Sequence, residues 1–174
     1  SRYATEVPPD LQSRAERERL SAPALKAFFN LTARWKIRDE DARALLGGVS
    51  NGPFYEMKRN PERVLDADRL LRLSYLIGIF KALRILHADA LADEWVHLPN
   101  QNPIFAGETP LSYMIRGGVP AMQTVRRLVG ARRAELARLA GQIDALSPLQ
   151  SLSRGYAVPL DESGHILRRR AQFE

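Results

Sequence analysis

A short polar and basic segment carries the side chains best suited to chemistry, and that chemistry is contact with nucleic acid. The candidate residues are Ser50, Asn51, Tyr55, Lys58 and Arg59. Hydroxyl and amide groups near the start of a slim helix can reach base edges or phosphates, and cations at its far end suit phosphates. The alternative interpretation is that this segment is one helix of an ordinary four-helix core.

Apolar side chains of the same segment should hold it against a core. We expect Phe54 and Met57 to pack inward, because a recognition helix needs one apolar face to fix it. Glu56 adds a negative charge to this helix. It could accept a hydrogen bond from a cytosine amino group or face solvent, and both interpretations stay open here.

Residues for other kinds of chemistry are absent or badly spaced. The chain has no cysteine, which excludes disulfides and thiolate-bound metals and fits a reducing cytoplasm. The three histidines, His87, His97 and His165, lack the spacing of metal ligands. The sequence has no phosphate-binding loop, no dinucleotide fingerprint and no nucleophile elbow. We therefore expect a protein that is not an enzyme, with no cofactor and no metal.

The charge balance favours a polyanionic partner. The 174 residues include 26 Lys and Arg against 20 Asp and Glu, a net charge of +6. Nucleic acid is the commonest such partner, although a basic surface without this role is the alternative. No run approaches the ~20 apolar residues of a membrane-spanning helix, and residues 1–20 lack the apolar core of a signal peptide. We expect a cytoplasmic protein without membrane association.

Helical periodicity predicts an all-α fold. A helix is expected from Ser21, with Ser21 as N-cap and Pro23 in the first turn. Two shorter helices, over 38–46 and 53–59, are joined by a glycine turn and form a helix-turn-helix pattern. A long helix over 66–87 is apolar around much of its circumference, which is typical of the centre of a bundle.

The second half of the chain should form a smaller helical module. A short helix near 91–95 and a loop rich in turn residues precede a brief helix from Thr109-Pro110 to Gly117-Gly118. A further helix opens at Pro120. Its apolar residues Leu136, Leu139, Ile143 and Leu146 fit two heptads of a coiled coil or an amphipathic helix on its own domain.

Four segments follow from these patterns. Residues 1–20 are expected to be a mobile N-terminal arm, in which a short solvated helix could begin after Asp10. Residues 21–88 are expected to form a helix-turn-helix domain, 89–134 the small helical module, and 135–174 a helical extension with a tail. In that tail, strand-like runs at 155–158 and 165–167 flank a glycine-containing turn, which predicts a short β-hairpin.

An ordered series of motifs between residue 21 and about residue 134 resembles the Xre/MbcA/ParS antitoxins. The motifs are Pro23 to Phe29, Arg34-Trp35, Ala44 to Gly47, Ser50 to Arg59, Leu73 to Leu83, Trp95, Leu98 to Asn100, Asn102 to Phe105, Gly107, Thr109 to Leu111, and Met114 to Met122. They cover about two-thirds of the chain. Met57 departs from the tryptophan frequent in the family's recognition helix, which leaves the operator sequence undetermined.

The resemblance implies a function and a second site. Such antitoxins bind and neutralise a RES-domain toxin that consumes NAD, and their helix-turn-helix module dimerises and represses its own operon. Residues 89–134 would then be the toxin-binding domain, and the partners would be toxin, operator DNA and a second copy in a homodimer or a higher hetero-oligomer. The toxin-binding residues carried over are Asn100, Asn102, Pro103, Gly107, Thr109, Pro110, Gly117, Gly118, Val119, Pro120, Ala121 and Met122.

The tail resembles a different protein. The segments 144–149, 153–158 and 164–167 are similar to the C-terminal end of the exonuclease VII large subunit. Two alternatives to the antitoxin therefore stay open: a helix-turn-helix transcriptional regulator without a toxin partner, and a fragment related to that exonuclease subunit.

Overall fold

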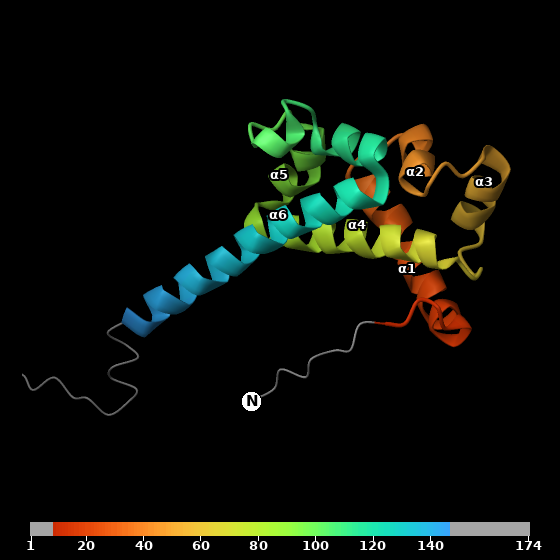
Figure 1. Cartoon of the computed structure of the whole chain (residues 1–174), viewed down its shortest axis with the longest axis horizontal. Coiled ribbons are helices and arrows are strands. Elements are labelled where there is room, and N and C mark those ends of the chain that lie inside the picture. The colour runs from red at the N-terminus through yellow and green to blue at the C-terminus, as the bar shows by residue number, and fades with distance from the viewer. Residues whose placement is uncertain (1–8, 147–174) are drawn as a thin grey trace, which may run out of the picture. The chain divides into compact units, whose positions relative to one another are not determined.

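The computed structural model describes residues 9–146, and over this range the chain is all-α, with no strand. The elements in chain order are α1 (Arg14–Arg34), α2 (Asp39–Leu45), α3 (Asn51–Arg59), α4 (Ala67–Leu86), α5 (Asp89–Glu94), the 3-10 turns η1 (Trp95–His97) and η2 (Pro103–Phe105), and α6 (Pro110–Leu146) (Figure 1). The chain divides into two compact units, residues 1–133 and 134–174. None of the described helices is both long and apolar enough to cross a membrane.

The core of the first unit forms where α1 packs along α4, the most extensive contact between two elements (Figure 1). α1 contributes Leu25, Phe28 and Leu31, which are 2% exposed or less. On α4 the fully buried residues include Leu73, Leu76 and Ile79. α4 buries residues on several sides, as its apolar circumference predicted.

α1 begins seven residues earlier than the predicted Ser21. Ser13 is the N-cap, and its hydroxyl accepts a hydrogen bond from the Glu16 backbone N–H at 3.5 Å. The ion pairs Arg14–Glu18 and Arg19–Glu16, four and three residues apart, support the first turns. The helix that could begin after Asp10 therefore exists, but residues 14–20 are continuous with the predicted helix from Ser21 and do not form a separate short one. Residues 1–8 lie outside the described range.

Pro23 lies inside α1 and not in its first turn. Proline removes only its own backbone hydrogen bond and disturbs the preceding turn, and the packing of the rest of α1 against α4 offsets this local cost. The sequence rule that places proline at a helix start was outweighed here by tertiary contacts.

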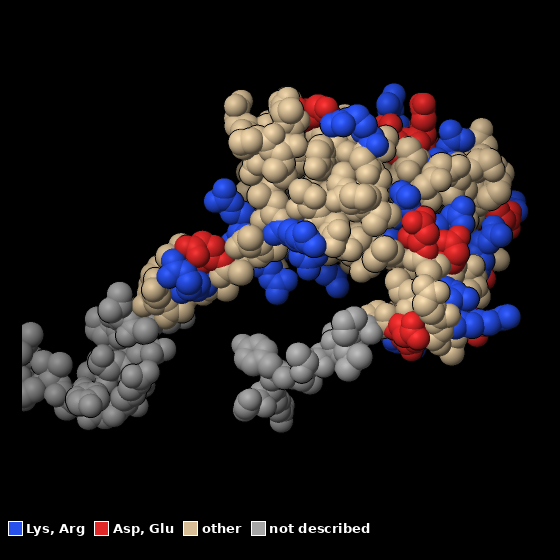
Figure 2. All heavy atoms as spheres, viewed as in Figure 1, with Lys and Arg blue, Asp and Glu red and all other residues tan. Residues whose placement is uncertain are grey.

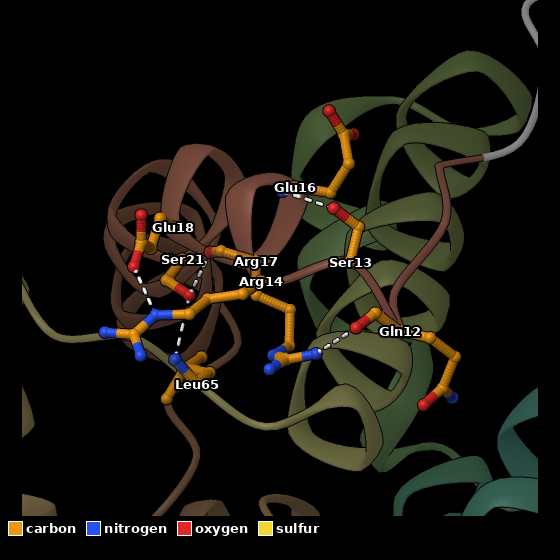
Figure 3. A network of polar contacts seen from close by, with 8 residues as sticks. All are labelled: Gln12, Ser13, Arg14, Glu16, Arg17, Glu18, Ser21 and Leu65. Atoms are coloured by element: carbon orange, nitrogen blue, oxygen red, sulfur yellow. Dashed lines mark hydrogen bonds and ion pairs between the residues drawn. The ribbon is translucent and has the colours of Figure 1, made fainter.

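Ser21, which is buried in α1, fastens the segment between α3 and α4 (Figure 3). Its hydroxyl donates to the Arg17 carbonyl at 2.5 Å, the bond that a serine inside a helix often makes. The same oxygen accepts a hydrogen bond from the Leu65 backbone N–H at 2.8 Å. Arg17 in turn donates to the carbonyls of Leu11 and Gln12 at 3.0 and 2.8 Å, which holds the chain before α1. A residue predicted as a cap thus joins two segments 44 residues apart.

The central elements agree with the sequence prediction. Gly47 and Gly48 follow α2 with φ values of +91° and +82°, the left-handed conformation that glycine accepts at a helix end. Asp66 caps α4 by accepting a hydrogen bond from the Arg69 backbone N–H at 2.8 Å. The two short helices and the long one after them therefore exist where the caps and periodicity predicted them.

α6 consists of two helices joined at Gly118, as the sequence predicted around Gly117-Gly118 and Pro120. Gly118 has non-helical geometry, at φ 63° and ψ −144°, so the chain bends there between a helix that begins at Pro110 and one that ends at Leu146. Glycine tolerates this conformation, and Pro120 lies in the first turn after the bend, where its missing N–H costs little. In the second unit, α6 exposes Leu136, Leu139 and Ile143, and the predicted β-hairpin lies outside the described residues.

We predict that Ser21→Ala lowers the free energy of unfolding by about 1–3 kcal/mol, because it leaves the buried Leu65 N–H without a partner. Urea unfolding followed by circular dichroism measures the change. The matched control is Ser74→Ala on the exposed side of α4, which should stay within about 0.5 kcal/mol of the native chain. Equal stability of the two variants would contradict the role assigned to Ser21.

Candidate nucleic-acid and partner interfaces

α3 is held against α1 by its apolar side. Phe54 is fully buried and Met57 is 5% exposed, which confirms that both pack inward. The Phe54 ring meets the Phe29 ring of α1 edge to face, with centroids 5.6 Å apart. Burying a phenylalanine contributes about 1.5–3 kcal/mol, so this contact fixes the orientation of a nine-residue helix that would be marginal alone.

The other side of α3 carries the predicted nucleic-acid residues together. Ser50, Asn51, Tyr55, Lys58 and Arg59 are all exposed. Ser50 is the N-cap, and its side chain makes no capping hydrogen bond, so the hydroxyl is available at the start of the helix. The Asn51 side chain accepts a hydrogen bond from Arg43 of α2. One face of α3 is therefore polar and accessible along its whole length.

Asp39 at the start of α2 links the two short helices. Its carboxylate accepts hydrogen bonds from the Lys58 ammonium and the Tyr55 hydroxyl, each at 3.0 Å. The bond from Lys58 is the main cause that holds the pKa of Asp39 below its usual value, and the bond from Tyr55 adds to it. Donating to this carboxylate raises the pKa of Tyr55. These bonds fix the position of α3 relative to α2, and they also neutralise Lys58.

The surface around α3 is balanced in charge. Arg59 pairs with Glu56, so the Glu56 carboxylate is directed along its own helix in this structure. Residues 38–63 hold five basic and five acidic side chains, namely Arg38, Arg43, Lys58, Arg59 and Arg63 against Asp39, Glu40, Asp41, Glu56 and Glu62. Contacts to bases or phosphates through α3 would therefore compete with ion pairs within the protein.

The predicted partner-binding residues before α6 act first as caps. Asn100 accepts a hydrogen bond from the Asn102 N–H at 2.9 Å, and Asn102 accepts one from the Ile104 N–H at 3.1 Å. Thr109 caps α6 by accepting from the Ser112 N–H at 3.1 Å. Gly107, at φ +83°, lets the chain turn between these caps. The loop that carries these residues therefore has a defined backbone.

Three of the predicted partner-binding residues lie in the core and not on the surface. Ala121 is 4% exposed, Met122 is fully buried, and Pro110 is also buried. Their side chains are occupied by packing within the unit. Pro103, Gly107, Gly117 and Pro120 are exposed, and Asn100, Asn102, Thr109, Gly118 and Val119 are half-buried. Only these residues present surface to a partner.

Sequence reasoning missed the apolar side chains of this loop. Leu98 is 42% exposed and Ile104 is 37% exposed, on either side of Asn100 and Asn102. Phe105 anchors the loop, because it is fully buried and packs edge to face on Tyr113 with centroids 5.3 Å apart. An apolar residue directly beside a buried anchor in a turn-rich loop is the signal that could have identified Ile104.

A pocket of about 560 Å³ lies beside this loop. α4, the loop and α6 line it, with His87 and Trp95 facing Asn100, Asn102, Pro103 and Arg132 among others. It brings three of the predicted partner-binding residues next to an aromatic ring.

Within residues 9–146 no group of three or more His, Asp or Glu side chains could hold a metal ion, and the His97 ring forms a hydrogen bond with the Trp35 carbonyl.

Comparison with known proteins gives a relative that is matched over most of its length. Over 110 residues the chain is 36% identical to the uncharacterized protein y4oB of Sinorhizobium fredii (strain NBRC 101917 / NGR234), a stretch that covers 63% of this chain and 83% of that protein. This chain belongs to the y4oB family. No family model matches the chain, and no solved structure matches it.

A second match is local. The chain is 44% identical over 45 residues to the exodeoxyribonuclease 7 large subunit of Koribacter versatilis (strain Ellin345). The matched stretch is 26% of this chain and 10% of that protein. A tenth of a subunit does not carry its activity, so this likeness assigns no nuclease function.

The Asp39 pairs predict a pH dependence. Because its pKa is lowered on folding, Asp39 stabilises the chain above its unfolded pKa of about 3.9, and this contribution is lost as the pH falls through the lower folded value. Compared with Asp39→Asn, the native chain should be more stable at pH 7 by less than about 1 kcal/mol, as for other exposed pairs.

Urea unfolding of both chains at a series of pH values tests this. Glu62→Gln, an exposed carboxylate without an ion pair to the described residues, is the control and should show no such difference. A difference between native chain and Asp39→Asn that grows toward acid pH would contradict the assignment.

Proposed function

We propose that this chain is an antitoxin of the Xre/MbcA/ParS type and not an enzyme. It binds and neutralises a RES-domain toxin that consumes NAD, and it represses its own operon by inserting α3 into the major groove of operator DNA. The observation that carries this proposal is α3 itself, anchored by Phe54 while Ser50, Asn51 and Lys58 lie on its exposed side. A DNA-binding repressor of this kind acts in the cytoplasm.

The neutral surface around α3 shapes how it recognises DNA. Non-specific affinity for duplex DNA comes from cations whose charge is not balanced by nearby carboxylates. Residues 38–63 have no net charge, so they contribute little of this affinity. The hydroxyl of Ser50 and the amide of Asn51 can instead bond base edges, which carry sequence information. α3 is therefore suited to discriminate between sequences more than to supply affinity.

We assign toxin binding to the loop before α6, residues 98–109. Its exposed apolar residues Leu98, Pro103 and Ile104 lie on a backbone fixed by Asn100 and Asn102. A rigid loop loses little conformational entropy when it binds, and apolar side chains supply the buried centre that a protein interface needs. Figure 2 shows a broad surface of uncharged residues over α5 and the start of α6.

DNA recognition is tested by fluorescence anisotropy with a duplex of the chain's own upstream region. Lys58→Ala and Arg59→Ala should weaken binding to all sequences and lower the salt slope by less than about 0.9 each, because both cations are already paired with carboxylates of the protein. Ser50→Ala and Asn51→Ala should change sequence preference instead. The control is Arg19→Ala, an exposed arginine of α1 paired with Glu16. Native-like binding by all four α3 variants would exclude α3 as the recognition helix.

Toxin neutralisation is tested by co-expression with a RES-domain protein encoded beside this chain, followed by size-exclusion chromatography. The native chain should form a stable complex and restore growth. Leu98→Asp and Ile104→Asp should abolish both, because a buried unpaired charge opposes association. Leu136→Asp, an equally exposed leucine of the second unit, is the control. No complex, with operator binding retained, would favour the alternative of a regulator without a toxin.

A further inference from the structure

The basic side chains of the described residues fall into two classes. Around α3 the cations Lys58 and Arg59 are paired with carboxylates, as are Arg14, Arg19 and Arg38 elsewhere. The stretch of α6 from 110 to 133 differs, since it holds five arginines and no aspartate or glutamate. Of these five, only Arg116 forms an ion pair with a described residue, Glu108. Four arginines within residues 110–133 of α6 therefore have no carboxylate partner among the described residues, and no acidic residue lies in that stretch.

The Arg126 side chain lies between α4 and α6, where two glycines leave space for it. A Cβ atom on Gly78 of α4 would collide with Arg126 Nε, and one on Gly130 of α6 would lie 3.0 Å from Arg126 Nη1. Glycine inside a helix costs about 1 kcal/mol relative to alanine. Both glycines leave room for the same guanidinium group, which lies across α4 without a carboxylate partner among the described residues.

Lys81 lies on the same side of α4, three residues after Gly78. It lines a groove of about 640 Å³ together with Arg126 and Ser74, and it is exposed and makes no ion pair to a described residue. Arg127 and Arg133 of α6 are also exposed and unpaired within the described range. Arg133 follows Arg126 by two helical turns, about 10 Å along the axis, so both project to the same side. Figure 2 shows several Lys and Arg side chains along the lower edge of the first unit.

We propose that Lys81, Arg126, Arg127 and Arg133 form a second nucleic-acid surface, which contacts the phosphates of duplex DNA without reading sequence. Arginine forks match phosphate oxygens, and uncompensated cations release the counterions of DNA on binding. The alternative is an acidic protein partner, which the competition experiment below distinguishes from duplex DNA.

This inference deepens the proposed function by separating two tasks. α3 lies near the beginning of α4 (Figure 1), whereas Arg126 of α6 lies against Gly78, further along α4. The surface on α6 would supply the phosphate attraction that the charge-balanced region 38–63 lacks. It does not require operator recognition, so the two proposals can fail independently.

The test measures binding of the full chain to a random-sequence duplex by fluorescence anisotropy over a series of KCl concentrations. Combined Arg126→Gln, Arg127→Gln and Arg133→Gln should lower the slope of log K against log salt by up to about 2.7, at about 0.9 for each phosphate neutralised. The matched control combines Arg14→Gln, Arg19→Gln and Arg138→Gln, which removes the same charge from exposed arginines that are paired. The control should lower the slope by less than about 1, because paired cations release few counterions.

Three results would overturn the inference. The first is a native slope in the α6 variant, and the second is an equal decrease in the control. The third is competition by poly-glutamate as strong as that by duplex DNA, which would point to an acidic protein. If the triple variant does not fold, the exposed single changes Arg127→Gln and Arg133→Gln give the same readout. Lys58→Ala, measured with the upstream-region duplex, separates failure of this surface from failure of α3.

Discussion

The burial of α4 is the constraint on which every candidate surface depends. Leu73, Leu76 and Ile79 are fully buried, and the contact of α4 with α1 is the most extensive between two elements. The segment before it is tied to α1 through Ser21, α5 is held by Arg84 through Asp89 and Asp93, and Arg126 of α6 rests on Gly78. Because the interior is closely packed, a shift of α4 would move all three surfaces together.

In the proposed function, affinity for DNA and discrimination between sequences fall to different parts of the chain. Asp39 holds α3 in place by bonding Lys58 and Tyr55, and in doing so it cancels charge that a phosphate would use. The arginines on α6 from 126 to 133 have no such partner among the described residues. A chain with net charge +6 therefore does not direct that charge through its helix-turn-helix segment. Net charge alone would have suggested the opposite, because it says nothing about which cations are already paired.

The sequence predicted what depends on local signals. The spacing of apolar residues predicted a helix over 66–87, close to α4, and one over 53–59, whereas α3 begins two residues earlier at Asn51. The inward packing of Phe54 and Met57 follows from the same spacing. The sequence placed the break in α6 at Gly117-Gly118 but misplaced the start of α1, because proline favours helix starts and packing against α4 keeps α1 continuous through Pro23.

Part of the candidate sites could not be predicted from the sequence. Asp39 and Lys58 are 19 residues apart, and Gly78 and Arg126 belong to different helices, so only the fold brings each pair together. The same holds for Met122, whose burial removes it from the partner surface that the family resemblance implied.

The most direct measurement of the central claim is a map of backbone amide chemical shifts in the full chain as a duplex of its own upstream region is added. The account predicts the largest changes at residues 50–59, with a second set at 126–133 that also appears with random-sequence DNA. Unchanged amides throughout 50–59 at saturating duplex would contradict the claim that α3 is the helix that recognises DNA.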